Sequence, residues 1–303
     1  MKYLMLRGAW DSRTQKSIDD DDDMWMQLFA ELCGMDYGII WLQGDYYTKH
    51  YRNNVHIICS PECNFDADIV FARGGFDYYD IKNTAKYAIR YAAGKRFVPT
   101  AKEYNLYDLL LVDSEKQKAD VLKVYPDANV QLWIKPAANH FKPVEVDKEY
   151  DICYIANGQQ AIIKNIQWVY DTVPSDLKVL HLGYPSDITP PDNVTCRRVD
   201  RIDMPTEISR CKVGIVPYRD IDSAPRALIE MIACRVPVVA FEGVNIWHAK
   251  YPCHKASKWM SVFWGEVQYR LRWWKNYSSV LEHYDMSTTT AADYLRGLID
   301  DVV

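Results

Sequence analysis

Two carboxylates and a small-residue turn between Asp222 and Phe241 have the types and spacing of an anion-binding site. The turn Ser223-Ala224-Pro225 can leave backbone N–H groups exposed, and a helix pattern with Arg226 in its first turn follows directly. Exposed N–H groups and the helix dipole both favour negative charge at a helix start. Asp222 and Glu230 stand eight positions apart, about two helical turns, so both carboxylates can border the same pocket.

A second candidate for phosphate binding lies upstream, beside a glycine turn. A buried-strand pattern at Asp151–Ala156 runs into Asn157-Gly158-Gln159-Gln160, and Lys164 precedes a helix pattern at Ile166–Thr172. A lysine ammonium near a helix start is a compact point charge suited to phosphate. The alternative interpretation of Lys164 is an ordinary solvated side chain.

Two glycine-containing turns in the first half also follow strand patterns. Arg7-Gly8-Ala9-Trp10 is predicted to be the turn after a strand at Tyr3–Leu6, and Arg73-Gly74-Gly75 follows a strand at Asp68–Ala72. In a doubly wound sheet such turns lie at the carboxyl edge, where ligands bind. Gly8 and Arg73 are therefore expected to face a substrate. No G-x-G-x-x-G occurs, so a dinucleotide fingerprint is absent.

Neither the acidic residues nor the cysteines predict a metal site. Asp66-Ala67-Asp68 has D-x-D form but precedes a strand, which favours a loop cap, and the run Asp19–Asp23 is expected to be solvated before a helix at Met24–Leu32. The eight cysteines are scattered, and Cys59 with Cys63 lacks zinc-ribbon spacing. This usage favours reduced thiols in the cytoplasm over disulfides.

Length and composition indicate a globular protein of two domains. The chain has 303 residues, of which 49% are hydrophobic and 25% charged, so each half can bury a core. The net charge of -5 supplies no global attraction to nucleic acid. No segment approaches the roughly 18 apolar residues of a membrane span.

The stretch around Glu230 resembles the E-x7-E segment of retaining GT-B glycosyltransferases of family 4. Glu230 matches the second acid, Asp222 replaces the first, and the following apolar run to Ala240 matches except for Arg235. In that family the second acid binds the donor ribose, and the first segment meets the donor sugar and phosphates. The resemblance extends from about Asp151 to Phe241, whereas the first half matches only in its alternation of predicted strands and helices.

The same resemblance assigns further donor-binding residues. Gly158 and Lys164 match the family's G-R-x4-K loop, which holds the pyrophosphate, with Gln159 in place of its Arg. Arg198 and Val199 stand where the family seats the nucleotide base. Arg73 occupies about the place of a family His.

These features predict an α/β chain of GT-B architecture, with two Rossmann-like, doubly wound parallel-sheet domains facing a cleft. We expect an acceptor-side domain at 1–146, a nucleotide-sugar domain at 147–281, and a last helix at 282–303 that crosses back.

The predicted function is retaining transfer of a hexosyl or pentosyl group from a nucleotide-diphosphate sugar to an acceptor hydroxyl, without metal or cofactor. The acceptor is not specified. One alternative is a DNA-modifying transferase, suggested by the interleaved cations and tryptophans of 260–275. Snorkelling cations on an amphipathic helix explain the same residues. The other alternative is a non-catalytic relative that serves as a binding or scaffold subunit.

Overall fold

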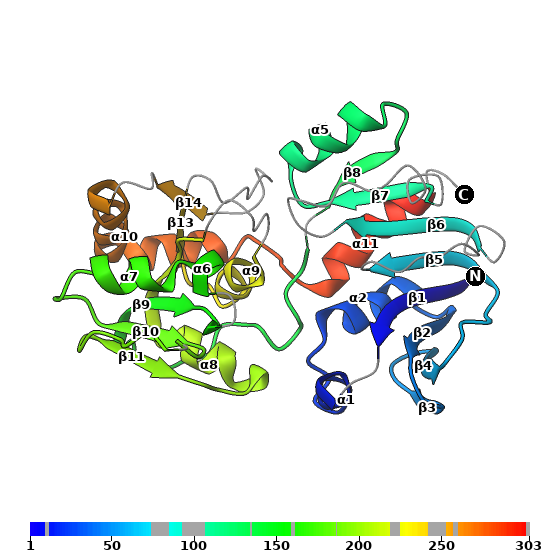
Figure 1. The fold of residues 1–303 in the computed structure, drawn as a ribbon, viewed down its shortest axis with the longest axis horizontal. Helices are drawn as coiled ribbons and strands as arrows, with labels where there is room; N and C mark the ends of the chain where they lie inside the picture. Colours follow the sequence, from blue (N-terminus) through cyan, green and yellow to red (C-terminus); the bar gives the residue numbers. More distant parts are fainter. Residues whose placement is uncertain are drawn as a thin grey trace. The chain divides into compact units, whose positions relative to one another are not determined.

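The computed structural model divides the chain into two compact units, Met1–Ala138 with Thr288–Val303, and Asn139–Ser287 (Figure 1). It describes residues 1–9, 12–73, 85–92, 107–133, 135–158, 161–185, 187–218, 225–241, 253–256 and 260–300, with backbone alone for 7–9, 12–14, 73 and 253–255. The domain limits expected at 146/147 and 281/282 stay a prediction. No described helix is long and apolar enough to cross a membrane.

The first unit is built on a sheet with the strand order β3-β4-β2-β1-β5-β6-β7-β8. Its described strands pair in parallel except for the edge strand β3, which runs antiparallel to β4. The bounds are β1 Lys2–Ala9, β2 Tyr37–Gln43, β3 Tyr47–His50, β4 Val55–Ser60, β5 Ala67–Arg73, β6 Ala85–Ala92, β7 Leu109–Val112 and β8 Val130–Leu132. Most of these strands are continuous apolar runs because a parallel sheet is buried on both faces.

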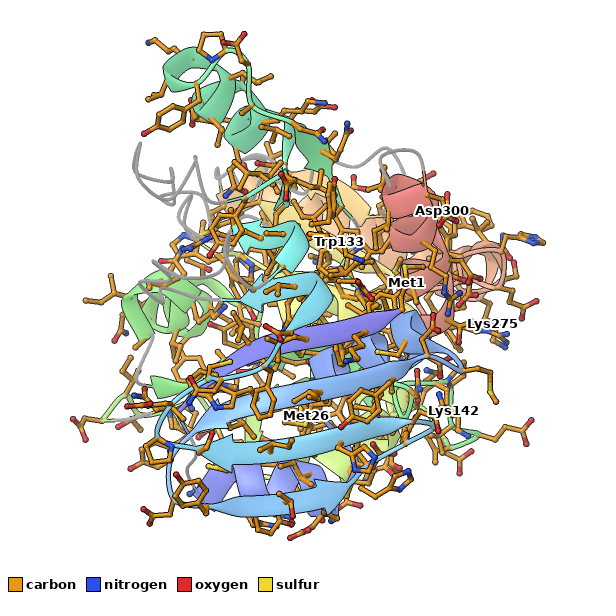
Figure 2. All side chains as sticks on the ribbon, turned by 90° about the vertical axis from the view of Figure 1, so that its right-hand side faces the viewer. Met1, Met26, Trp133, Lys142, Lys275 and Asp300 are labelled. Carbon is orange, nitrogen blue, oxygen red and sulfur yellow. The ribbon has the colours of Figure 1, made fainter. Side chains whose placement is uncertain are left out.

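Helices complete the first unit: α1 Ser12–Asp19, α2 Met24–Cys33, α5 Glu115–Val124 and α11 Thr288–Asp300. Trp25 of α2 lies against Phe71, Tyr91 and Trp133 in the core, with ring centroids 6.0, 4.7 and 5.3 Å away. Met26 and Trp133 are labelled in Figure 2, which looks onto this unit.

The last helix returns to the first unit, as expected. In Figure 1 α11 lies beside α2, and the two helices are in contact. Arg296 donates hydrogen bonds to the carbonyls of Glu31 and Leu32 near the end of α2, and Tyr294 Oη donates to Leu132 O at 3.1 Å. The carbonyls at a helix end lack intrahelical partners, so an arginine there caps α2 from outside.

The second unit is built on a parallel sheet with the order β11-β10-β9-β12-β13-β14. Its strands are β9 Tyr150–Ile155, β10 Val179–Leu182, β11 Val194–Arg197, β12 Cys211–Val216, β13 Val238–Phe241 and β14 Cys253–Ala256. Its helices are α6 Ala161–Lys164, α7 Ile166–Thr172, α8 Met204–Ser209, α9 Arg226–Ala233 and α10 Met260–Leu281, with a 3-10 turn, η2, at Arg201–Asp203. Helices α9 and α10 both pack on β12 and β13.

Three expectations about local structure were wrong. Gly8 is not in a turn, because β1 continues through Ala9 across a register irregularity between Leu6 and Ala9. The helix expected over Met204–Cys211 ends at Ser209, because Cys211 already pairs with Tyr150 in the sheet. The helical structure expected directly after Pro252 is preceded by the short strand β14, which pairs with β13 before α10 begins.

The run Asp19–Asp23 is only partly solvated. Asp23 is the N-cap of α2 and accepts from the N–H groups of Trp25 and Met26 at 2.9 and 3.1 Å, as an acid before a helix should. Asp22 is buried, contrary to the expectation, because the turn between α1 and α2 folds it inward.

Candidate functional site

The strand order of the second sheet reverses between β9 and β12, which makes this point the topological switch point of the sheet. From β9 the order runs to β10 and β11 on one side, and β12 leads to β13 and β14 on the other. In open parallel sheets, ligands bind beyond the carboxyl ends of the strands at such a switch point. The two strands end at Ile155 and Val216, so the loops that follow these residues are positioned to border a ligand.

Lys164 lies at this switch point, over an aromatic ring. Its Nζ is 3.8 Å from the ring centroid of Tyr218, which follows β12 and is fully buried. The Tyr218 hydroxyl donates to Ile155 O at the end of β9, which fixes the ring under the ammonium. A cation on a ring gains about 0.5–2 kcal/mol, depending on its exposure to water. Lys164 is half-buried, and the ring that its ammonium contacts is fixed between the ends of both strands.

The backbone that carries Lys164 is fixed as well. Lys164 ends α6 instead of opening the next helix, and Asn165 caps α7 in a left-handed conformation with φ 65°. Tyr154 Oη donates to Lys164 O at 2.7 Å, and Asn165 Nδ2 donates to Pro217 O at 3.1 Å. Asparagine tolerates this backbone conformation better than most residues. The α6–α7 junction is thereby tied to the exits of both β9 and β12.

Glu230 is a buried carboxylate on α9, with 6% of the residue exposed. Arg201 Nη2 donates to Glu230 Oε1 at 2.9 Å, and the Arg201 guanidinium lies 5.4 Å from the Phe141 ring centroid. A carboxylate this buried needs a partner, and the pair joins α9 to η2, the turn that follows β11. One carboxylate oxygen is thus oriented by an arginine from another part of the sheet.

A histidine supports the turn that leaves β9. His181, fully buried on β10, contacts Ala156 O through Nε2 at 2.9 Å and Tyr170 Oη through Nδ1 at 2.5 Å. Because Ala156 O can only accept, His181 carries its proton on Nε2 and accepts from Tyr170. Burial lowers the pKa of His181 from its ordinary value of 6.5, so the imidazole is neutral at pH 7.

The loops after β9 and β10 are in direct contact. Gly183 adopts φ +138°, and a Cβ there would lie 1.7 Å from Ala156 O, so only glycine fits. Gly158 N donates to Tyr184 O at 2.5 Å. The N–H of Gly158 is therefore engaged within the protein instead of pointing at an open anion site.

The remaining described donor-side candidates either follow β11 or begin α9. Arg198 is exposed and Val199 half-buried, directly after β11. Pro225 caps α9, and Arg226, its first residue, is exposed. Proline has no polar side chain to satisfy the first N–H groups of the helix. Four predicted residues lie outside the described residues: Gln159, Asp222, Ser223 and Ala224.

In the first unit, Gly8 and Arg73 belong to neighbouring strands at the switch point of that sheet. Strand β1 pairs with β2 on one side and β5 on the other, and Gly8 and Arg73 lie at the carboxyl ends of β1 and β5. Topology therefore brings the two predicted acceptor-side residues to one edge. For Arg73 the description covers the backbone alone.

Sequence reasoning missed three residues that shape the site: Arg201, Tyr218 and His181. Arg201 lies three positions after Arg198 and was indistinguishable from it without knowledge of which arginine reaches α9. Tyr218 follows an apolar strand, so the sequence pattern predicts an ordinary core residue at this position. His181 gave a detectable signal, because a histidine inside the apolar strand Val179–Leu182 requires polar partners.

No group of three or more His, Cys, Asp or Glu residues within the described ranges could hold a metal ion. In the D-x-D sequence, Asp68 accepts from Lys2 N at 2.8 Å and pairs with Lys86 at 2.7 Å. Asp68 lies within β5 instead of in the loop before it, and its carboxylate binds the backbone N–H of Lys2 at the start of β1 and the ammonium of Lys86 on β6.

The predicted basic and aromatic surface of α10 is smaller than expected. Trp264 is buried, stacked 6.1 Å from Trp168, and donates from Nε1 to Thr172 Oγ1 at 3.1 Å. Arg270 is paired with Glu266 and lies 4.1 Å from the Tyr277 ring centroid. Trp264 is thus unavailable for stacking on a base, and the Arg270 charge is largely compensated.

Comparisons with known proteins identify the architecture. No protein-family model and no curated protein sequence matches the chain. Among solved structures, sucrose-phosphate synthase from Thermosynechococcus elongatus matches with TM-score 0.68 and 11% identity, covering 100% of this chain and 99% of the other. Anabaena HepE in complex with UDP matches with TM-score 0.67 and 10% identity, covering 100% of both chains. The E. coli structure described as trehalose-6-phosphate bound with UDP-2-fluoro glucose matches with TM-score 0.67 and 8% identity, again covering 100% of both.

At such identities the likeness shows the fold alone. The chain has the GT-B fold of these glycosyltransferases, with two sheets of doubly wound order and a last helix that returns to the first unit.

Proposed function

We propose that the chain is a glycosyltransferase that moves a sugar from a nucleotide-diphosphate sugar to an acceptor hydroxyl. The observation that carries the proposal is the buried Glu230, oriented by Arg201 in the unit whose switch point also holds Lys164 over Tyr218. A fixed carboxylate suits the hydroxyls of a ribose, and a fixed ammonium suits a diphosphate. The resemblance around E-x7-E and the GT-B fold support the same reading.

The roles follow from where charge develops. As the bond from the sugar to the diphosphate breaks, negative charge grows on the leaving diphosphate. Lys164 and the start of α9 would stabilise that charge because they are already positioned before the reaction begins. Glu230 would accept from the ribose hydroxyls, and Asp222 would position the donor sugar. The other donor-binding residues would be Gly158, Gln159, Arg198, Val199, Ser223, Ala224, Pro225 and Arg226.

The two units would divide the substrates between them. The unit with Glu230 would bind the nucleotide sugar, and Gly8 and Arg73 of the first unit would face the acceptor. We further propose retention of the anomeric configuration, a hexosyl or pentosyl donor, and no requirement for a metal or cofactor. The seven cysteines whose side chains the structure describes are unpaired thiols, which fits a protein of the reducing cytoplasm.

Mass spectrometry of the purified chain with a panel of nucleotide sugars tests the activity. The expected result is donor hydrolysis without acceptor and transfer to a productive acceptor, both unchanged in EDTA. NMR of the product anomer tests retention. Complete, metal-reversible loss in EDTA would refute metal independence. Nucleotide binding without hydrolysis or transfer would favour the scaffold alternative, and transfer to hydroxymethylated DNA would favour the DNA-modifying one.

A further inference from the structure

One face of helix α10 carries a line of exposed apolar side chains. Val262, Tyr269 and Trp273 are 51%, 48% and 51% exposed. Their spacing of seven and then four residues places them on the same face, since a helical turn takes roughly 3.6 residues. Val280, 50% exposed, follows beyond the break in the helix at Trp273. Other residues of α10 pack on β12, β13 and β14, so this line is separate from the face that joins the core.

The core does not account for these side chains. An apolar side chain stabilises the fold through the area that it removes from water, and these residues leave about half of theirs in contact with it. Single exposed apolar residues are ordinary on protein surfaces, whereas apolar residues gathered in one patch mark interaction sites. The line on α10 therefore indicates a contact with something outside the second unit.

Cations border the apolar line. Arg272 and Lys275 are exposed on either side of Trp273, and Lys275 is labelled in Figure 2. Glu266, the only acid within α10, pairs with Arg270 at 2.6 Å. The helix therefore presents net positive charge beside its apolar line, although the whole chain has a net charge of -5.

An anionic lipid surface matches both properties of this face. Tryptophan and tyrosine favour the boundary between water and lipid, and aliphatic side chains of an amphipathic helix enter the acyl region below it. Lysine and arginine beside them are attracted to anionic headgroups. This combination is typical of a helix that lies in the plane of a bilayer surface.

Two other partners fit this face less well. A single-stranded nucleic acid uses cations and stacking rings, but the aliphatic Val262 and Val280 add nothing to base stacking, and Trp264 is buried. In a two-fold contact between copies centred on Trp273, the neighbouring cations of both chains would approach one another. The one acid of the helix is already engaged with Arg270 and does not offset that repulsion.

We infer that α10 docks the protein on an anionic lipid surface, with Trp273 inserted at the boundary and the cations facing the headgroups. The helix lies on the bilayer, because no described helix is long and apolar enough to cross one. This binding does not depend on the proposed sugar transfer, so its failure leaves that proposal standing.

Cosedimentation of the full chain with phosphatidylcholine vesicles, with and without phosphatidylserine, tests the inference. We expect the parent to bind the vesicles that contain phosphatidylserine and to bind them more weakly as salt is added. Trp273→Ala should bind on the order of tenfold more weakly, because a half-exposed ring no longer leaves water. Tyr46→Ala is the matched control, since it removes a ring that is 86% exposed in the first unit, and it should bind like the parent.

A second pair of variants tests the charge. Arg272→Gln with Lys275→Gln should weaken binding to the phosphatidylserine vesicles about twenty- to thirtyfold, at roughly fivefold for each cation. The same double variant should bind vesicles of phosphatidylcholine alone as the parent does. Lys123→Gln with Lys178→Gln is the control, because both lysines are exposed and the change in net charge is the same. This control should bind both kinds of vesicle like the parent.

The inference is overturned if phosphatidylserine vesicles do not bind the parent, or bind it no better than phosphatidylcholine alone. It is also overturned if the α10 variants bind like the parent. Melting temperatures show whether each variant is folded, and the charge variant decides alone if Trp273→Ala unfolds. Two further results would assign the face to another partner and refute the lipid surface. One is a dimer, seen by light scattering, that Trp273→Ala dissociates; the other is binding of a single-stranded oligonucleotide without binding of vesicles.

Discussion

The Glu230–Arg201 pair allows a test in which stability and donor binding are predicted to respond differently. Arg201→Met leaves a carboxylate that is buried to 6% exposure without its cation. Breaking a buried ion pair in this way costs about 3–5 kcal/mol. The Arg201 side chain is 26% exposed, so water already screens part of the interaction and about 2–3 kcal/mol is expected.

Glu230→Ala should weaken donor binding more than it weakens the fold. The cation left behind on Arg201 can reach water, so the variant is expected to fold. A carboxylate bound to ribose hydroxyls makes charge-assisted hydrogen bonds of about 1.5–3 kcal/mol each, so affinity should fall at least tenfold. The 2′-deoxy nucleotide, which lacks one of those hydroxyls, should bind the variant and the parent with more similar affinities than the ribonucleotide does.

The assay is calorimetric titration of the best-binding nucleoside diphosphate and its 2′-deoxy analogue, beside urea unfolding of both variants. The reasoning is refuted if folded Glu230→Ala keeps the parent's affinity and its preference for the ribonucleotide. It is also refuted if Arg201→Met is as stable as the parent, because the buried carboxylate would then have another partner.

Three further predictions concern the turns around the donor site. Lys164→Ala should lower turnover about a hundredfold and weaken nucleotide affinity less, and Lys164→Arg should restore turnover only in part. Lys178→Ala, which changes an exposed lysine, is the control and should have no effect. If both Lys164 variants turn over like the parent, the phosphate site lies elsewhere. Because the pKa of His181 is lowered in the fold, the unfolded chain binds more protons below about pH 6.5, and the free energy of unfolding should fall on acidification through that range. Urea unfolding at several pH values should show a weaker dependence of that free energy on pH in His181→Asn than in the parent. An equal dependence in both proteins would contradict this prediction. Gly183→Ala should lower the free energy of unfolding by more than the roughly 1–3 kcal/mol of backbone strain alone. Gly265→Ala is the control and should raise the melting temperature, because a Cβ there meets nothing within 4 Å. Equal effects of the two substitutions would show that the Gly183 turn adapts.

The sequence determined most of the elements in the second unit. Helix Ile166–Thr172 was predicted with its observed bounds, because apolar periodicity and turn residues mark it clearly. The GT-B fold and the returning last helix were predicted from the resemblance to GT-B glycosyltransferases, and the alternation of predicted strands and helices agreed with it. Strands β3, β6 and β14 were not predicted; β3 and β14 are short edge strands whose polar residues give little apolar signal.

Only the tertiary structure decided which side chains meet. Glu230 was recognised from its spacing to Asp222, but its partner Arg201 comes from beyond another strand, and no local pattern relates residues 29 positions apart. Likewise, Lys164 was identified beside a glycine turn, whereas the ring beneath it, Tyr218, comes from the exit of β12. Strand order determines these contacts, because parallel strands that are distant in sequence end at the same edge of the sheet.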